Sequence, residues 1–101
     1  MKEALVFQEK TGRIVVPSQS LAMIVSEAVE LSGAKVRRHP RRSIAFELAA
    51  EPPRVTVGIV APLGAVLPEL ASQVQQSVHQ ALAVMCDLGR ATVDVTVEEV
   101  A

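Results

Sequence analysis

The chain has 101 residues, a formal net charge of −1, one cysteine and only two aromatic residues. Its length fits one domain over residues 1–101. A single cysteine excludes an internal disulfide, and no apolar run approaches the ~20 residues that a membrane-spanning helix needs. We therefore expect one domain in the cytoplasm, and we expect any contact with a membrane to go through a partner or a surface patch.

The first elements along the chain are two short extended segments, residues 4–7 and 13–16, which a turn at Gly12 joins. The apolar residues then change to helical spacing, which predicts a helix over residues 18–32. One of the serines at its start is expected to cap it, because a serine oxygen accepts a hydrogen bond from an unpaired helix amide. Gly33 stands where the end of a helix favours a positive φ.

The middle of the chain changes to a period of two. Residues 44–48 and 55–60 each alternate between apolar and other side chains, and a Glu-Pro-Pro break separates them. We expect these two strands to form a hairpin. The longest helix follows over residues 67–88, with Pro68 in the first turn, where its missing N–H costs nothing, and Gly89 at the stop.

The last segment, residues 92–100, alternates strictly and predicts a strand with one solvated face, which Asp94 and Glu98 share. The element order is therefore β-α-β-β-α-β. Two amphipathic helices and one half-exposed sheet bury each other's apolar surfaces when they stack. We predict an α+β fold with both helices packed on one face of a small mixed or antiparallel sheet.

Known catalytic constellations do not occur in the sequence. It has no glycine-rich phosphate loop, no Cys-x-x-Cys pair and no Gly-x-Ser-x-Gly motif. His39 lies among arginines, which repel a metal cation, and His79 lies on the polar flank of the second helix without a ligand partner one turn away. Cys86 in the last helical turn beside Asp87 lacks the positive field that makes a thiolate reactive. The sequence predicts a non-enzymatic protein without a metal or cofactor.

A basic segment over residues 35–42 is the most unusual feature of the sequence. It holds five of the ten positive charges, and no acidic residue occurs between Glu30 and Glu47. Clustered arginines suit phosphate groups of nucleic acid or lipid, whereas a solvated loop before a strand explains the same composition. The candidate anion or partner contacts are Lys35, Arg37, Arg38, Arg41 and Arg42.

The outer surface of the second helix is polar but nearly uncharged. Gln73, Gln76 and Gln80 recur on it, where charged side chains are commoner on a purely solvated helix. These residues are a candidate partner face. Because glutamine is a good helix former, helix stability alone explains them equally well.

Several motifs, taken in order, resemble the alkaline shock protein family of bacterial envelope-stress proteins. They are Gly12-Arg13-Ile14, a helix ending at Gly33, Leu63-Gly64, Leu67-Pro68-Glu69-Leu70-Ala71, Val74-Gln75, Val78, Met85 and Val93-Asp94-Val95-Thr96-Val97. The resemblance covers roughly residues 10–100. The chain departs from the family at Leu63, where an aromatic residue is usual, and at Cys86-Asp87, where a Thr-Gly pair is common.

The resemblance implies a non-catalytic cytosolic protein that is held at the membrane by an anchoring partner and serves envelope homeostasis. Our leading hypothesis is a scaffold or adaptor that acts through protein contacts and forms a homo-oligomer. Two alternatives remain open. One is a module that binds nucleic acid or anionic lipid through residues 35–42, and the other is a small regulatory domain that binds a metabolite.

Overall fold

In a computed structural model, the described residues are 4–36 and 43–101. Within these residues the chain forms two helices and five strands. In chain order they are β1 (Ala4–Glu9), β2 (Gly12–Pro17), α1 (Ser18–Leu31), β3 (Ile44–Glu47), β4 (Arg54–Ala61), α3 (Leu67–Cys86) and β5 (Thr92–Val100).

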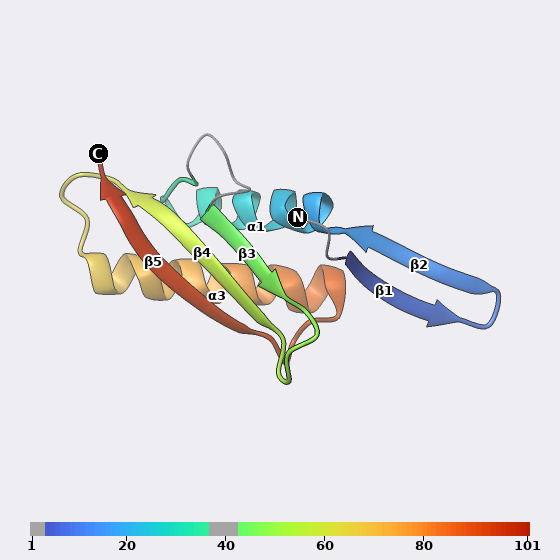
Figure 1. The fold of residues 1–101 in the computed structure, drawn as a ribbon. Coiled ribbons are helices and arrows are strands. Elements are labelled where there is room, and N and C mark those ends of the chain that lie inside the picture. Colours follow the sequence, from blue (N-terminus) through green and yellow to red (C-terminus); the bar gives the residue numbers. More distant parts are fainter. Residues whose placement is uncertain (1–3, 37–42) are drawn as a thin grey trace.

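The body of the molecule has two layers (Figure 1). A sheet with the order β3-β4-β5 forms one layer, and both helices lie on the same face of it. Strands β3 and β4 pair antiparallel, as the expected hairpin, whereas β4 and β5 pair parallel. A parallel pair needs a crossover connection, and α3 provides it. The predicted α+β class, with two helices on one face of a small mixed sheet, is confirmed.

The core lies between the sheet and the helices. Strand β4 is central, and Val55, Val57, Ile59 and Ala61 point from it toward the helices with no exposed surface. The helices contribute side chains at helical spacing that are likewise fully buried: Leu21, Val25 and Val29 from α1, and Val74, Val78 and Leu82 from α3. Aliphatic side chains therefore form almost the whole core, with Phe46 the one buried aromatic among the described residues.

Strands β1 and β2 form a separate antiparallel hairpin that extends away from the body (Figure 1). Its register places Leu5 opposite Val16, and these two residues pack against the core. The predicted order had one strand before the first helix; this segment instead forms two strands that pair only with each other. The molecule is consequently elongated, with principal extents of 51 × 23 × 21 Å.

The sequence-based prediction is wrong for the start of α1 and confirmed for its end. The predicted serine cap is wrong, because Pro17 occupies the N-cap position and no side chain there makes a cap hydrogen bond. Ser18, the first helical residue, is buried instead. The other end is as predicted: Gly33 has a φ of +91°, and its amide donates to the Glu30 carbonyl oxygen at 3.1 Å.

Helix α3 carries proline in its first turn, as predicted, but it ends earlier than predicted. Asp87, not Gly89, takes the left-handed conformation with φ of +55°. The Leu88 amide donates to the Leu82 carbonyl oxygen at 3.0 Å. Leu88 is buried in the core, so the chain must reverse at residue 87 to bring that side chain inward.

Candidate functional site

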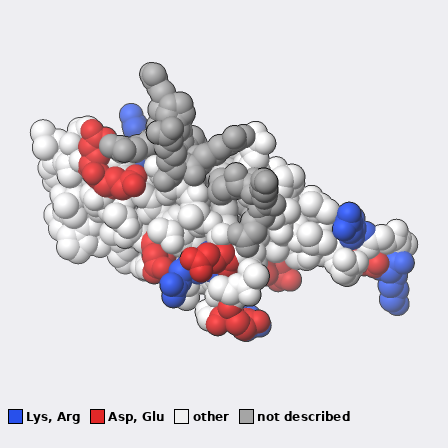
Figure 2. Space-filling view, viewed as in Figure 1, with Lys and Arg blue, Asp and Glu red and all other residues white. Residues whose placement is uncertain are grey.

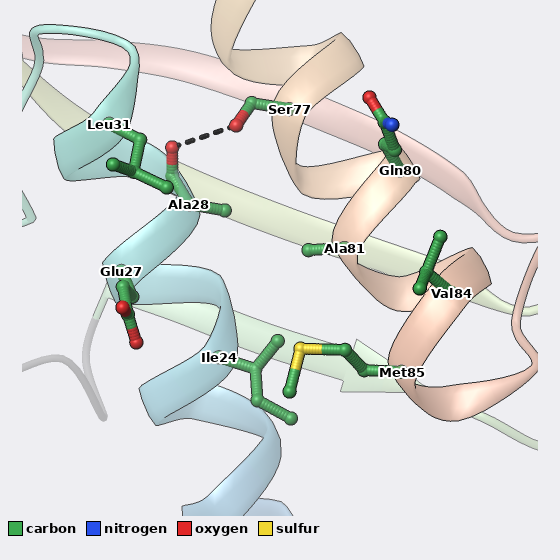
Figure 3. A pocket seen from close by; sticks show the side chains of 9 residues that line it. All are labelled: Ile24, Glu27, Ala28, Leu31, Ser77, Gln80, Ala81, Val84 and Met85. Atoms are coloured by element: carbon green, nitrogen blue, oxygen red, sulfur yellow. Dashed lines mark hydrogen bonds between the residues drawn. The ribbon is translucent and has the colours of Figure 1, made fainter.

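A groove of about 460 Å³ runs along the seam between α1 and α3, on the side of the helices that faces away from the sheet. Figure 3 shows the side chains that line it, and they come from both helices. The lining residues are Ile24, Glu27, Ala28, Leu31, Ser77, Gln80, Ala81, Val84 and Met85.

Small residues and hydroxyl groups form the floor of this groove. Ala28 and Ala81 face each other across the seam, as Figure 3 shows. Ser77 Oγ donates a hydrogen bond of 3.0 Å to the Ala28 carbonyl oxygen, which also accepts one of 3.1 Å from Ser32 Oγ. Serine therefore ties α3 directly to the last turn of α1, where backbone carbonyls lack helical partners.

The walls of the groove are apolar and open to solvent. Leu31, Val84 and Met85 expose most of their side chains, and Ile24 lies beside Met85 at one end (Figure 3). Methionine adapts its shape easily to a contacting surface. Glu27 and Gln80 are the polar groups of the lining besides Ser77, so the groove combines apolar walls with a polar rim.

The structure describes all three residues of the predicted glutamine face, Gln73, Gln76 and Gln80. Gln80 lines the groove. Gln76 lines a different depression of about 410 Å³ between α3 and β5. The backbone carbonyl oxygen of Gln73 accepts a long hydrogen bond of 3.5 Å from Ser32 Oγ. All three glutamines are exposed and recur at helical spacing on α3, and the partner face that they were predicted to form stays a prediction.

Sequence reasoning missed the apolar wall of the groove. The helical spacing of α3 places Met85 on the same broad face as the core residues, yet it is 67% exposed. The buried side chains of α3 recur every four residues from Leu70 to Cys86. Four residues turn an α-helix by 400°, which is 40° more than a full turn, so this buried stripe winds gradually around the helix. Met85 is left on the α1 side of that stripe. Val84, one position earlier, is an apolar residue that lies fully outside the stripe. Its position in the sequence could have indicated this exposed surface.

The depression between α3 and β5 is polar. The Gln75 Nε2 donates to the Val93 carbonyl oxygen at 2.7 Å and so occupies part of the outer edge of β5. The Nε2 of His79 lies 2.8 Å from the Gly89 carbonyl oxygen, to which it donates when it carries the proton. His79 therefore connects the helix to the turn after it. This contact gives it a local structural role.

The predicted anion contacts lie mostly outside the described residues. Arg37, Arg38, Arg41 and Arg42 belong to that part of the chain, as does His39. Lys35 is described and exposed. Its backbone pairs with Val60 through hydrogen bonds of 3.1 Å and 2.7 Å, which places the first residue of the basic segment beside β4.

The sulfur of Cys86 faces the core, since the residue is 2% exposed. Burial raises the pKa of its thiol above the usual value, because the thiolate loses its hydration there. A raised pKa disfavours nucleophilic chemistry at this position. Among the described residues, no group of three or more potential ligand side chains could hold a metal ion, and no helix is long and apolar enough to cross a membrane.

The geometry defines a class of protein: an α+β body with an open, apolar two-helix groove and a protruding hairpin. Comparison of the chain with protein-family models, with curated proteins and with solved structures finds no match. The groove between α1 and α3 is therefore the basis for a functional proposal.

Proposed function

We propose that this protein is a non-catalytic scaffold or adaptor that acts through protein contacts in cell-envelope homeostasis. The resemblance to the alkaline shock protein family supplies the cellular setting of this proposal. The observation that supports protein contact is the groove between α1 and α3, where Leu31 is 82% exposed and Val84 is 77% exposed. Exposed apolar patches with a polar rim are typical of protein interaction sites.

The groove favours an apolar protein element over a charged polymer. Neither α1 nor α3 contains lysine or arginine, so this surface offers no cation to a phosphate backbone. Binding would remove the walls around Val84 and Met85 from water, which stabilises a complex by about 25 cal/mol for each Å² of apolar surface buried. The polar rim at Glu27 and Gln80 would orient the partner through a cation or a hydrogen-bond donor.

Photo-cross-linking in living cells tests this proposal. A photoreactive amino acid replaces Val84 in the tagged chain, and a matched chain carries it at Leu63, which is equally exposed but lies in the β4–α3 loop. Adducts are then identified from separated membrane and soluble fractions.

We expect discrete protein adducts at position 84 and none at position 63. A membrane protein among the adducts supports the adaptor function. The same adducts at both positions, or none at either, contradict the proposal. Recovery of nucleic acid in the purified chain would instead favour the basic segment, and replacing its four arginines with serine should then abolish that binding.

A further inference from the structure

The β1–β2 hairpin is the second apolar surface that this chain leaves uncovered. Val6 and Val15 lie opposite each other on one of its faces, and Phe7 and Ile14 lie opposite each other on the other. Val6, Ile14 and Val15 are 43, 53 and 47% exposed. An isolated two-stranded hairpin is at best marginally stable in water. The hairpin therefore gains stability from any partner that covers it.

The charges of the hairpin and of the helical layer are complementary. Lys10 and Arg13 lie at the tip of the hairpin together with Glu9, and Figure 2 shows basic and acidic atoms there. The two helices hold Glu27, Glu30 and Glu69 and no lysine or arginine. Glu27 itself lines the groove. The hairpin thus has apolar faces and, counting Glu9, Lys10 and Arg13, a tip of net charge +1, and the groove has apolar walls with Glu27 in its lining.

The hairpin is about twice as long as the α1 wall of the groove, but the spacing of its apolar and basic residues is similar to the spacing of apolar and acidic residues along α1. The stretch of α1 from Ile24 to Leu31 is about 10 Å long at 1.5 Å per residue, and each six-residue strand of the hairpin is about 20 Å long. Arg13 lies two residues from Val15 in the same strand, and this spacing is about 7 Å along the strand axis. Three to six residues of helix separate Ile24 from Glu27 and Glu30, about 4.5 to 9 Å.

We propose that the hairpin is a dimerisation arm that lies in the α1–α3 groove of a second copy of the chain, with the exchange made reciprocally. The hairpin extends beyond the start of α1 (Figure 1), so a two-fold axis across the arm directs the partner's hairpin back along α1. Its tip then points from the Ile24 end of the groove past Glu27 toward the Leu31 end (Figure 3). A two-fold dimer forms this contact twice.

This inference rests on the proposed function, because it names an occupant of the same groove. A closed dimer of the chain is then the unit of the scaffold. The test uses the purified full chain, in which no other protein is present, and measures its mass in solution as a function of concentration by sedimentation equilibrium.

Three paired substitutions make the test specific. The arm variant carries Ile14→Glu and Val15→Glu, and the groove variant carries Leu31→Glu and Val84→Glu. The control carries the same chemical change at two exposed positions away from both surfaces, Leu63→Glu and Val66→Glu. Circular dichroism and thermal unfolding show that each variant is folded before its mass is measured.

The unsubstituted chain and the control are expected to form dimers, and the arm and groove variants to be monomers. An equal mixture of the arm and groove variants is expected to recover a dimer, because one intact arm meets one intact groove. That heterodimer should dissociate more readily than the natural dimer. Arg13→Glu should weaken the dimer about fivefold, and Glu27→Arg added to it should restore the affinity.

Other outcomes overturn the inference. A monomeric natural chain does so, as does an arm variant that dissociates while the groove variant does not, since the hairpin then meets another surface. If the mixture of the arm and groove variants fails to form a dimer, the inference is also overturned. If the purified chain is monomeric while position 84 still cross-links to another protein in cells, self-docking fails and the proposed function stands. If neither experiment detects contact at the groove, both fail.

Discussion

Glu98 lies across Gly58 on the open face of the sheet, so that a β-carbon at position 58 would overlap the Glu98 carboxylate. The two residues come from neighbouring strands, and the register between β4 and β5 shifts directly after the Ile59–Val97 pair. A bulge of this kind redirects a side chain. Glu98 Oε1 accepts a hydrogen bond of 3.2 Å from Ser43 Oγ, which comes from the far side of β4. The carboxylate therefore bridges the sheet above a glycine.

The effect of Gly58→Ala should depend on residue 98. Alanine is favoured over glycine in a strand interior by about 0.5–1 kcal/mol. In the natural chain it must displace Glu98 and break the hydrogen bond from Ser43, which is worth about 0.5–1.5 kcal/mol. The two effects nearly cancel there, whereas in a Glu98→Ala background the substitution should stabilise by the full 0.5–1 kcal/mol. Urea unfolding of the four proteins measures the coupling; equal effects in both backgrounds would show that Glu98 does not lie over Gly58.

Periodicity predicted the elements that have one buried face. The helix boundaries were close at Ser18–Leu31 and Leu67–Cys86, and the strand Thr92–Val100 was predicted with its solvated face correctly assigned. In each case the pattern is determined by burial on one side, and burial leaves a regular trace in the sequence.

The pairing of the strands and the packing of the helices left no such regular pattern in the sequence. Nothing in residues 4–17 distinguishes strands that join the main sheet from a hairpin that stands apart, because both alternate in the same way. The parallel pairing of β5 with β4 depends on the crossover through α3. The groove was missed for a related reason: Met85 has the spacing of a core residue, and only the position of α1 decides that it faces solvent.

Asp87 is a position where substitution should stabilise the protein. Its left-handed conformation is unfavourable for most residues with a β-carbon, and its negative charge lies at the negative end of the α3 dipole. Asn tolerates the same conformation without the charge, so Asp87→Asn should raise the free energy of unfolding by about 0.3–1 kcal/mol. Asp87→Ala is the control, since it removes the charge but not the backbone strain. A larger gain with alanine than with asparagine would contradict this account.

Cys86 should be protected from alkylation in the folded chain. Burial raises the pKa of its thiol, so the folded state favours the neutral form. We expect iodoacetamide at pH 8 to modify the thiol far more slowly in the native protein than in denaturant. A chain with Cys86→Ala and Val84→Cys provides an exposed thiol on the same helix as the control. Rapid modification of native Cys86 would contradict its burial.

The same pKa shift predicts how stability depends on pH. The stabilisation from a buried neutral thiol is fully present below the pKa of the unfolded thiol, and it is lost as the pH rises through the higher pKa of the folded thiol. In that alkaline range the natural chain should lose more stability than Cys86→Ala does. Denaturant unfolding at several pH values measures the difference, and parallel pH profiles for the two proteins would contradict the shift.

Ser77 should contribute more to the stability of the helix pair than Ser32, although both hydroxyls donate to the Ala28 carbonyl oxygen. Ser77 joins the two helices through a hydrogen bond of 3.0 Å, whereas Ser32 lies four residues from Ala28 in the same segment and reaches α3 only through its long 3.5 Å hydrogen bond to Gln73. The Ser32 amide already donates to the Val29 carbonyl oxygen. Ser77→Ala should therefore lower the free energy of unfolding by about 0.5–1.5 kcal/mol.

Ser32→Ala alone should cost less, because Ser77 still satisfies the carbonyl. The double substitution should cost more than the sum of the two, since it leaves a half-buried acceptor without either hydroxyl and such a group carries the larger penalty. A double-mutant cycle by urea unfolding decides between these cases. If the two costs simply add, each hydroxyl acts independently and Ala28 is not a shared acceptor. If Ser32→Ala costs the most, the contact stabilises the end of α1 and not the seam that forms the floor of the groove.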